Sequence, residues 1–169
     1  MVGYAMQPHI GAVGTKLLYP DNTVQHAGII LGIGGIAQHC FIDNPRDDVG
    51  FYGRLSVPFN YSAVTAACLM VSKEKYLEVN GLEEDLQVAF NDVDFNLKLL
   101  KQGYYNICLN HVELYHHESK SRGDDTVDTS SAKYRRFVQE HDYIKDKWGY
   151  MLYNDRFYNP NLSLKKHLF

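Results

Sequence analysis

Two acidic residues and two histidines stand where elements of secondary structure are expected to begin and end. Asp92 and Asp94 open a helical pattern, NDVDFNLKLLKQG, and His116 and His117 end a strand-like stretch, YYNICLNHVELYHH. A carboxylate acts as a general base when it lies within hydrogen-bond distance of a hydroxyl group. An imidazole is a common metal ligand and carries protons near neutral pH. These residues are therefore the first candidates for chemistry.

The acidic pair also has a structural interpretation. Carboxylates in the first turn of a helix are stabilised by its unpaired amides and its dipole, by about 0.3–1 kcal/mol each. Asn91 is a candidate N-cap for the same helix. The triplet Asp92-Val93-Asp94 has the form of a DxD metal motif, although two acids at this spacing are common by chance. On these residues alone, capping and catalysis both remain open.

The histidines are followed by a polar loop that carries positive charge. Adjacent residues of a regular strand point to opposite faces, so His116 and His117 are not expected to hold one ion together. At the carboxyl end of a strand one of them can face a site, and the alternative is an ordinary hydrogen-bonded histidine. Lys120 and Arg122 lie in the loop. This loop is either simply solvated or closes on an anion such as diphosphate.

Alternating strands and helices are expected to position these groups. A strand at 11–19 and an extended run at 24–32 form a hairpin-like pair around the turn residues PDNT. Irregular chain is expected over 32–60, and the apolar run 62–71 predicts a buried central strand. The remaining elements are a helix between Ser72 and Gly81, a helix at 91–103, a strand at 104–116 and a long helix at 130–149. This alternation is typical of the α/β class.

Composition limits the class of protein further. The length of 169 residues suits one domain or part of a larger one. A net charge of −3 gives no electrostatic case for nucleic-acid binding. No apolar run approaches the roughly 18 residues of a membrane span. Cys40, Cys68 and Cys108 are widely spaced and odd in number, which favours reduced thiols in a reducing compartment such as the cytoplasm.

Several segments, taken together and in order, resemble bacterial family 2 glycosyltransferases, most of all those that build surface or capsular polysaccharides. The segments are GAVGTKLLYPDNTVQHAGIILG, NYSAVTAACLMVSKEKYLEVNGLEEDL, AFNDVDFNLKLLKQGY, ELYHHESKSRG and DRFYNPNLSL. The resemblance covers the chain from about Met1 to Leu164. It implies a GT-A fold, which is an α/β fold with a mixed sheet and flanking helices. It also implies transfer of a sugar, with inversion, from a nucleotide-activated donor to a glycan or lipid-linked acceptor.

The resemblance also implies a role for each matching position. Asp92 matches the general base that deprotonates the acceptor, and Asn91 stands where glutamate is common in that motif. His116 matches the histidine that helps to hold a metal–diphosphate, with Mn²⁺ or Mg²⁺ as the expected cofactor. Asn91 is also an implied substrate contact. The remaining implied substrate contacts are Thr65, Ala66, Ala67 and Cys68 on the acceptor side, and Lys120, Ser121 and Arg122 over the donor phosphates.

One part of the family pattern is missing. The family begins with a nucleotide-binding half that carries a DxD motif, and the chain has no counterpart to it. Residues 1–169 are therefore expected to be the C-terminal, acceptor-side part of an incomplete GT-A domain that is inactive alone. The expected location is the cytoplasm, either free or at the inner face of the membrane. An exposed sheet edge would favour self-association, as a two-fold dimer. The alternatives are a catalytically silent binding module and a metal-dependent hydrolase that uses Asp92, Asp94 and His116.

Overall fold

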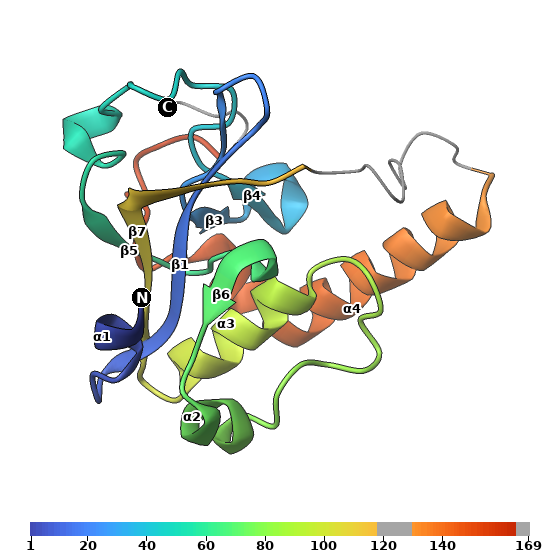
Figure 1. The fold of residues 1–169 in the computed structure, drawn as a ribbon. Helices are drawn as coiled ribbons and strands as arrows, with labels where there is room; N and C mark the ends of the chain where they lie inside the picture. Colours follow the sequence, from blue (N-terminus) through green and yellow to red (C-terminus); the bar gives the residue numbers. More distant parts are fainter. Residues whose placement is uncertain (118–129, 165–169) are drawn as a thin grey trace.

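A five-stranded mixed sheet forms the centre of the computed structural model, which describes residues 1–117 and 130–164 (Figure 1). Strand β1 is central: it pairs in parallel with β7 on one side and antiparallel with β2 and β6 on the other. Strand β5 pairs antiparallel with β7 and ends the sheet. The strands are β1 (Ile10–Leu18), β2 (Val24–His26), β5 (Pro58–Tyr61), β6 (Leu69–Met70) and β7 (Tyr105–Tyr115).

Helices and a second, two-stranded sheet surround this centre. The small sheet pairs β3 (Ile29–Leu31) with β4 (Ala37–His39). The helices are α1 (Val2–Ala5), α2 (Lys73–Glu78), α3 (Asn91–Lys101) and α4 (Ala132–Tyr153), and three 3₁₀ turns lie at Ile33–Gly35, Phe51–Gly53 and Ala66–Cys68. Figure 1 shows α3 and α4 together on one side of β1 and β7. The α/β class is confirmed, and the GT-A assignment stays a prediction. No helix of the described residues is long and apolar enough to span a membrane.

Most of the expected elements are present. The hairpin of β1 and β2 and the strand β7 are confirmed, as are the helices α2, α3 and α4. The Ser72 hydroxyl caps α2 by accepting a hydrogen bond from the Lys75 amide. The N-cap predicted at Asn91 is wrong, because Asn91 is the first helical residue and Phe90, in the left-handed region at φ 61°, is the N-cap. The region 32–60, expected to be irregular, contains the short strands β4 and β5.

The buried central strand predicted at 62–71 is also wrong. This segment is mostly irregular, with a 3₁₀ turn at Ala66–Cys68 and only the two-residue strand β6. The Thr65 hydroxyl caps the turn by accepting a hydrogen bond from the Ala67 amide. Val64 is fully buried where Gly14 of β1 leaves room, since a Cβ at Gly14 would lie 2.7 Å from the Val64 Cβ. Apolar burial, the signal used for the strand, is therefore real at Ala63 and Val64, where it comes from packing onto the sheet, whereas Ala66 and Ala67 are exposed.

A buried charge network ties β1 to β7 where their register shifts. The register jumps from Thr15–Leu109 to Lys16–Glu113, so residues 110–112 bulge from β7. The Lys16 ammonium, on a side chain only 4% exposed, lies 2.6 Å from the Glu113 carboxylate. The Arg46 Nε donates to the other oxygen of Glu113 at 2.8 Å. Burial alone would raise the pKa of Glu113, but the hydrogen bonds from Lys16 and Arg46 lower it below its ordinary value of 4.5.

Replacing Glu113 by glutamine is expected to destabilise the fold by about 2–3 kcal/mol at neutral pH, because Lys16 would keep its buried charge without a carboxylate partner. The stability advantage of Glu113 is complete above pH 4.5 and declines as the pH falls through the lowered pKa of the folded state. Urea unfolding across this pH range measures the difference. The exposed Glu84→Gln is the control, and an equal loss at pH 3 and pH 7 would contradict the assignment.

Self-association stays a prediction, and β5 carries the open strand edge that would support it. Strand β5 pairs only with β7, so its other edge faces no strand in the described part of the chain. Val57, just before it, is 46% exposed. Open strand edges readily pair with another chain. Light scattering over a concentration series is expected to give a mass above that of one chain, and a constant monomer mass would contradict this.

Candidate functional site

Asp92 is the second residue of α3, and its side chain faces the turn at 66–68. The carboxylate is half-buried, and its Oδ2 accepts a hydrogen bond from the Ala66 amide at 3.1 Å. Its Oδ1 accepts from the Val93 amide at 2.8 Å. Both oxygens are thus oriented by backbone N–H groups, and each keeps capacity to accept another hydrogen bond. The structure therefore brings together the base predicted at Asp92 and the acceptor-side segment predicted at 65–68.

Asn96, one turn further along α3, holds these two segments together. Its side-chain Nδ2 donates to the backbone oxygens of Asp92 at 2.7 Å and Val64 at 3.0 Å. Its Oδ1 accepts from the Val64 amide at 3.2 Å. Asn96 is fully buried, so these bonds satisfy backbone groups that have no strand partner. A second buried amide, that of Asn106, donates to the backbone oxygens of Ser62 and Asn96.

Strand β2 connects this region to the end of β7. The Thr65 amide donates to Nε2 of His26 at 3.4 Å. His26 is fully buried, and burial lowers its pKa well below the ordinary value of 6.5, so the ring is neutral at physiological pH. The preceding residue, Gln25, points its Oε1 at Nδ1 of His116, at 2.8 Å. A short chain of contacts through Gln25 and His26 therefore links the neighbourhood of Asp92 to His116.

His116 and His117 differ in environment. His116 directly follows β7, and its backbone amide donates to the Leu18 carbonyl at 2.9 Å. Its ring is half-buried against Gln25, whereas His117 is exposed. This geometry agrees with the choice of His116 as the inward histidine, and a role toward diphosphate stays a prediction. The predicted phosphate contacts Lys120, Ser121 and Arg122 lie outside the described residues.

Asp94 and Asn91 have structural partners. Asp94 is fully buried, with its Oδ1 2.7 Å from the indole Nε1 of Trp148 and 2.9 Å from the Lys147 ammonium. It holds α4 against α3 and does not join Asp92 and His116. Within residues 1–117 and 130–164, no group of three or more His, Cys, Asp or Glu could hold a metal ion. Asn91 donates to the carbonyls of Glu83 and Leu86, so its amide is engaged by the preceding loop.

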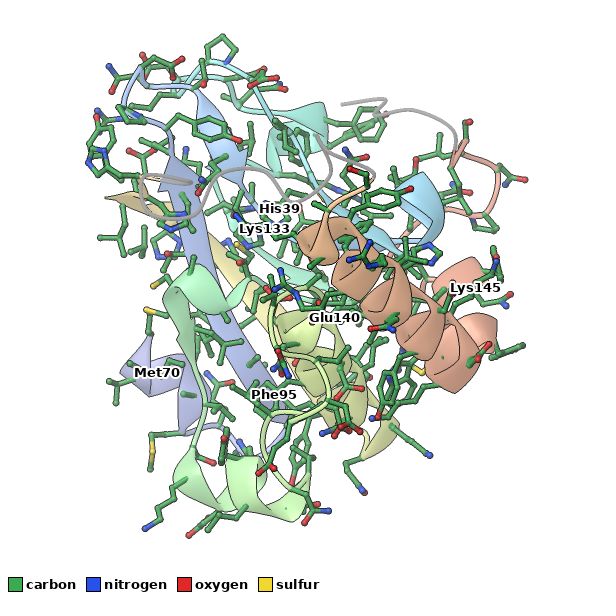
Figure 2. All side chains as sticks on the ribbon, turned by 90° about the vertical axis from the view of Figure 1, so that its right-hand side faces the viewer. His39, Met70, Phe95, Lys133, Glu140 and Lys145 are labelled. Atoms are coloured by element: carbon green, nitrogen blue, oxygen red, sulfur yellow. The ribbon has the colours of Figure 1, made fainter. Side chains whose placement is uncertain are left out.

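The loop before α3 depends on a residue that sequence reasoning missed. The Glu140 carboxylate, buried on α4, accepts hydrogen bonds from the successive amides of Gln87, Val88 and Ala89. Figure 2 shows Glu140 on the side of α4 toward α3 and Lys145 on the outer side. Successive N–H groups that converge on one carboxylate form an anion-binding concavity. Glu140 therefore fixes the chain that leads into Asp92.

Sequence reasoning also missed Gln25 and His26. Gln25 and His26 lie in the short run VQHAGIILG, which indicates a strand but no site. The available signal was two adjacent polar residues in an otherwise apolar segment. A regular strand sends adjacent side chains to opposite faces, so both can be buried only if both faces are covered. Both are buried in the structure.

Comparison with known proteins gives two partial relatives. No protein-family model matches the chain. Uncharacterized protein y4gI of Sinorhizobium fredii is 45% identical over 170 residues, covering 100% of this chain and 18% of that protein. O-antigen biosynthesis protein RfbC of Myxococcus xanthus is 35% identical over 175 residues, covering 97% of this chain and 12% of that protein. The chain thus spans less than a fifth of the length of either relative.

Replacing Asn96 by aspartate is expected to destabilise the protein by about 3 kcal/mol or more. The substitution keeps the size of the side chain but removes both donated hydrogen bonds and places a carboxylate against the carbonyls of Val64 and Asp92. Urea unfolding measures the loss. The same change at the exposed tail residue Asn161, which lies outside the core, is expected to cost within about 0.5 kcal/mol. Equal effects at the two positions would contradict the role given to Asn96.

Proposed function

We propose that this chain is the acceptor-side part of an inverting family 2 glycosyltransferase that acts in surface polysaccharide synthesis. One observation carries the proposal: the half-buried Asp92 carboxylate, held by two backbone N–H groups beside the 65–68 turn. The name of the Myxococcus relative, an O-antigen biosynthesis protein, supports the pathway class. The substrates are a nucleotide-activated sugar and a glycan or lipid-linked acceptor, and the reaction is placed in the cytoplasm, at the inner face of the membrane.

Asp92 acts as the general base in this proposal. The acceptor hydroxyl donates its proton to a carboxylate oxygen as its own oxygen forms a bond to the anomeric carbon. The bond from that carbon to the diphosphate breaks on the opposite face, and its electron pair leaves with the phosphate oxygen. The hydrogen bonds from Ala66 and Val93 keep the carboxylate in one orientation, which reduces the cost of alignment. The acid proton then passes to solvent.

His116 stands on the leaving-group side. Its Nδ1 is held by the Gln25 oxygen, so Nε2 is the nitrogen that can ligate a cation. One imidazole supplies only a single nitrogen ligand, so the diphosphate oxygens and other groups of the native polypeptide would have to supply the oxygen ligands that Mn²⁺ or Mg²⁺ prefers. When bound, such an ion would offset the negative charge that the departing diphosphate gains. Lys120, Ser121 and Arg122 are proposed to contact the same phosphates, and Cys68 with its neighbours to line the acceptor.

The proposal is tested by Asp92→Asn in the native polypeptide that carries this chain. Sugar transfer is expected to fall by about 10²–10⁴-fold, because amide nitrogen cannot accept the proton. Donor affinity should stay within a factor of about two, since the variant keeps the size and hydrogen-bonding shape of the side chain. The control is Asp85→Asn, an exposed acid of the neighbouring loop.

Near-normal transfer by Asp92→Asn would overturn the assignment of the base. A wild-type protein that binds glycan but transfers no sugar from any nucleotide donor would instead support the catalytically silent module. Release of free sugar from the donor, unaffected by acceptor, would point to hydrolysis. The three results are separated by following the nucleotide, the free sugar and the acceptor product in one assay.

A further inference from the structure

A groove with a volume of about 830 Å³ lies along β5, between the start of the chain and the tail that follows α4. It is separate from the neighbourhood of Asp92. The turn that contacts Asp92 leads into β6, and β6 and β7 pair with opposite edges of β1 (Figure 1). Strand β5 lies beyond β7 in the same sheet. The volume falls within the range of about 300–1,000 Å³ that is typical of small-molecule sites.

Aromatic rings in fixed positions line this groove. Three of them come from distant parts of the chain: Tyr4 of α1, Phe59 of β5 and Phe157 of the tail. The Arg54 guanidinium lies over the Phe59 ring, 4.2 Å from its centroid. Phe157 packs edge-on against Tyr105, with centroids 6.2 Å apart. Rings supported in this way offer apolar contact area at a low cost in conformational entropy.

Asparagine side chains supply the polar part of the lining, from Asn60, Asn159 and Asn161. The Asn159 Oδ1 accepts from the backbone amide and from Nδ2 of Asn161, at 2.9 and 3.1 Å, which fixes a turn in the tail. Within residues 1–117 and 130–164, neither the Asn60 side-chain amide nor the Tyr4 hydroxyl has a hydrogen-bond partner. A side-chain amide both donates and accepts, so it can pair with neighbouring hydroxyl groups of one ligand.

Asp155 keeps the tail wall of the groove in place. Its Oδ1 accepts from the Ser62 hydroxyl at 2.8 Å and from the Phe157 amide at 2.7 Å. Its Oδ2 accepts from the Leu31 amide at 2.8 Å. The tail is therefore tied to two other segments before any ligand binds, and a site formed in advance does not lose affinity to ordering.

The charge of the lining favours a neutral ligand. Among the described residues that line the groove there is no Asp, Glu or Lys, and Arg156 carries the single charge. Its guanidinium lies over the Tyr105 ring, 4.8 Å from the centroid, and donates to the Tyr105 hydroxyl at 2.9 Å. A cation would find no acidic partner here, and a multiply charged anion would meet one cation that is already engaged.

We propose that this groove binds a neutral sugar chain. The C–H groups on one face of a pyranose ring pack against aromatic rings, and its hydroxyl groups pair with side-chain amides. Phe157 and Tyr4 provide the apolar contacts, and Asn60 provides the amide. The site rests on the lining of the groove and not on the proposed transferase function.

The first experiment follows the aromatic and asparagine side-chain NMR signals of the chain as methyl glycosides of glucose, mannose and rhamnose are added. At least one of them is expected to shift the signals of Asn60 and Phe157, with a Kd of about 1–10 mM for a ligand of this size. An α-linked trisaccharide of the same sugar should bind at least about ten-fold more tightly, because the groove is larger than one ring. No shift with any of the three glycosides would overturn the proposal.

Variants then locate the bound sugar. Phe157→Ala is expected to abolish the shifts, and Asn60→Ala to weaken binding by about three- to ten-fold through the loss of hydrogen bonds to hydroxyl groups. Because the Asn60 amide has no partner among the described residues, this variant keeps the test decisive if Phe157→Ala does not fold. The control is Tyr150→Ala, which removes a ring that is 82% exposed on α4, outside the groove. Unchanged affinity in Asn60→Ala would contradict the site.

Further outcomes separate this inference from the proposed function. Asp92→Asn should leave the sugar affinity of the groove unchanged, whatever it does to transfer. Loss of the shifts in that variant would place the sugar at the 65–68 turn and overturn the groove site. Groove binding in a protein whose transfer ignores Asp92→Asn would leave the sugar site standing and remove the assigned base.

Two other occupants give different results. Displacement of the sugar by inorganic phosphate would assign the groove to an anion held by Arg156, and would overturn the proposal. Signals of Asn60 and Phe157 that move with protein concentration but not with sugar would show that a second copy of the chain covers β5, and would overturn it as well.

Discussion

The buried backbone at Ser62, Val64 and Thr65 has no strand partner among the described residues, and the rest of the site depends on how its hydrogen bonds are made. Among residues 62–66, Ala63 bridges to Ile29 of β3. A buried backbone group left without a hydrogen bond costs about 1–3 kcal/mol. Asn96 and Asn106 avoid this cost by supplying side-chain amides in place of a neighbouring strand. Because Asn96 also binds the Asp92 carbonyl, the same amide sets the distance between the segment and α3. The hydrogen bond from Ala66 to Asp92 follows from that distance.

Strand β2 links the 62–66 segment to His116, which follows β7. It is only three residues long, yet all three are buried. Its two polar residues tolerate burial because each has hydrogen-bond partners. The Thr65 amide donates to His26, and the two oxygens of Gln25 contact the rings of His39 and His116. Burial keeps His26 neutral, so it accepts the Thr65 hydrogen bond without a charge to compensate. A neutral, hydrogen-bonded interior of this kind is rigid, which would suit the proposed transferase site, where a base and a leaving group are held apart.

Local patterns predicted the first hairpin and the helices correctly, but not the conformation of residues 62–71. The periodicity at 91–103 and the cap at Ser72 are encoded within a few residues, so α2 and α3 were predictable. The stretch 62–71 failed because an apolar run reports burial and not conformation, and here Gly14 and Asn96 decide the conformation from distant positions. For the site, Asp92 and His116 were found from motif order. Gln25 and His26 were not, because their importance arises only when β2 lies between Thr65 and the end of β7.

Three buried or half-buried acids surround the start of α3, and their partners separate their roles. Asp94 is neutralised by Lys98 and Lys147 and bonded to Trp148, so it anchors α4. Glu140 is saturated by successive amides and fixes the loop ahead of the helix. Asp92 alone of the three has no cationic partner among the described residues, and it is held only by two amides. An acid arranged in this way is oriented but not neutralised, and that leaves it able to accept a proton.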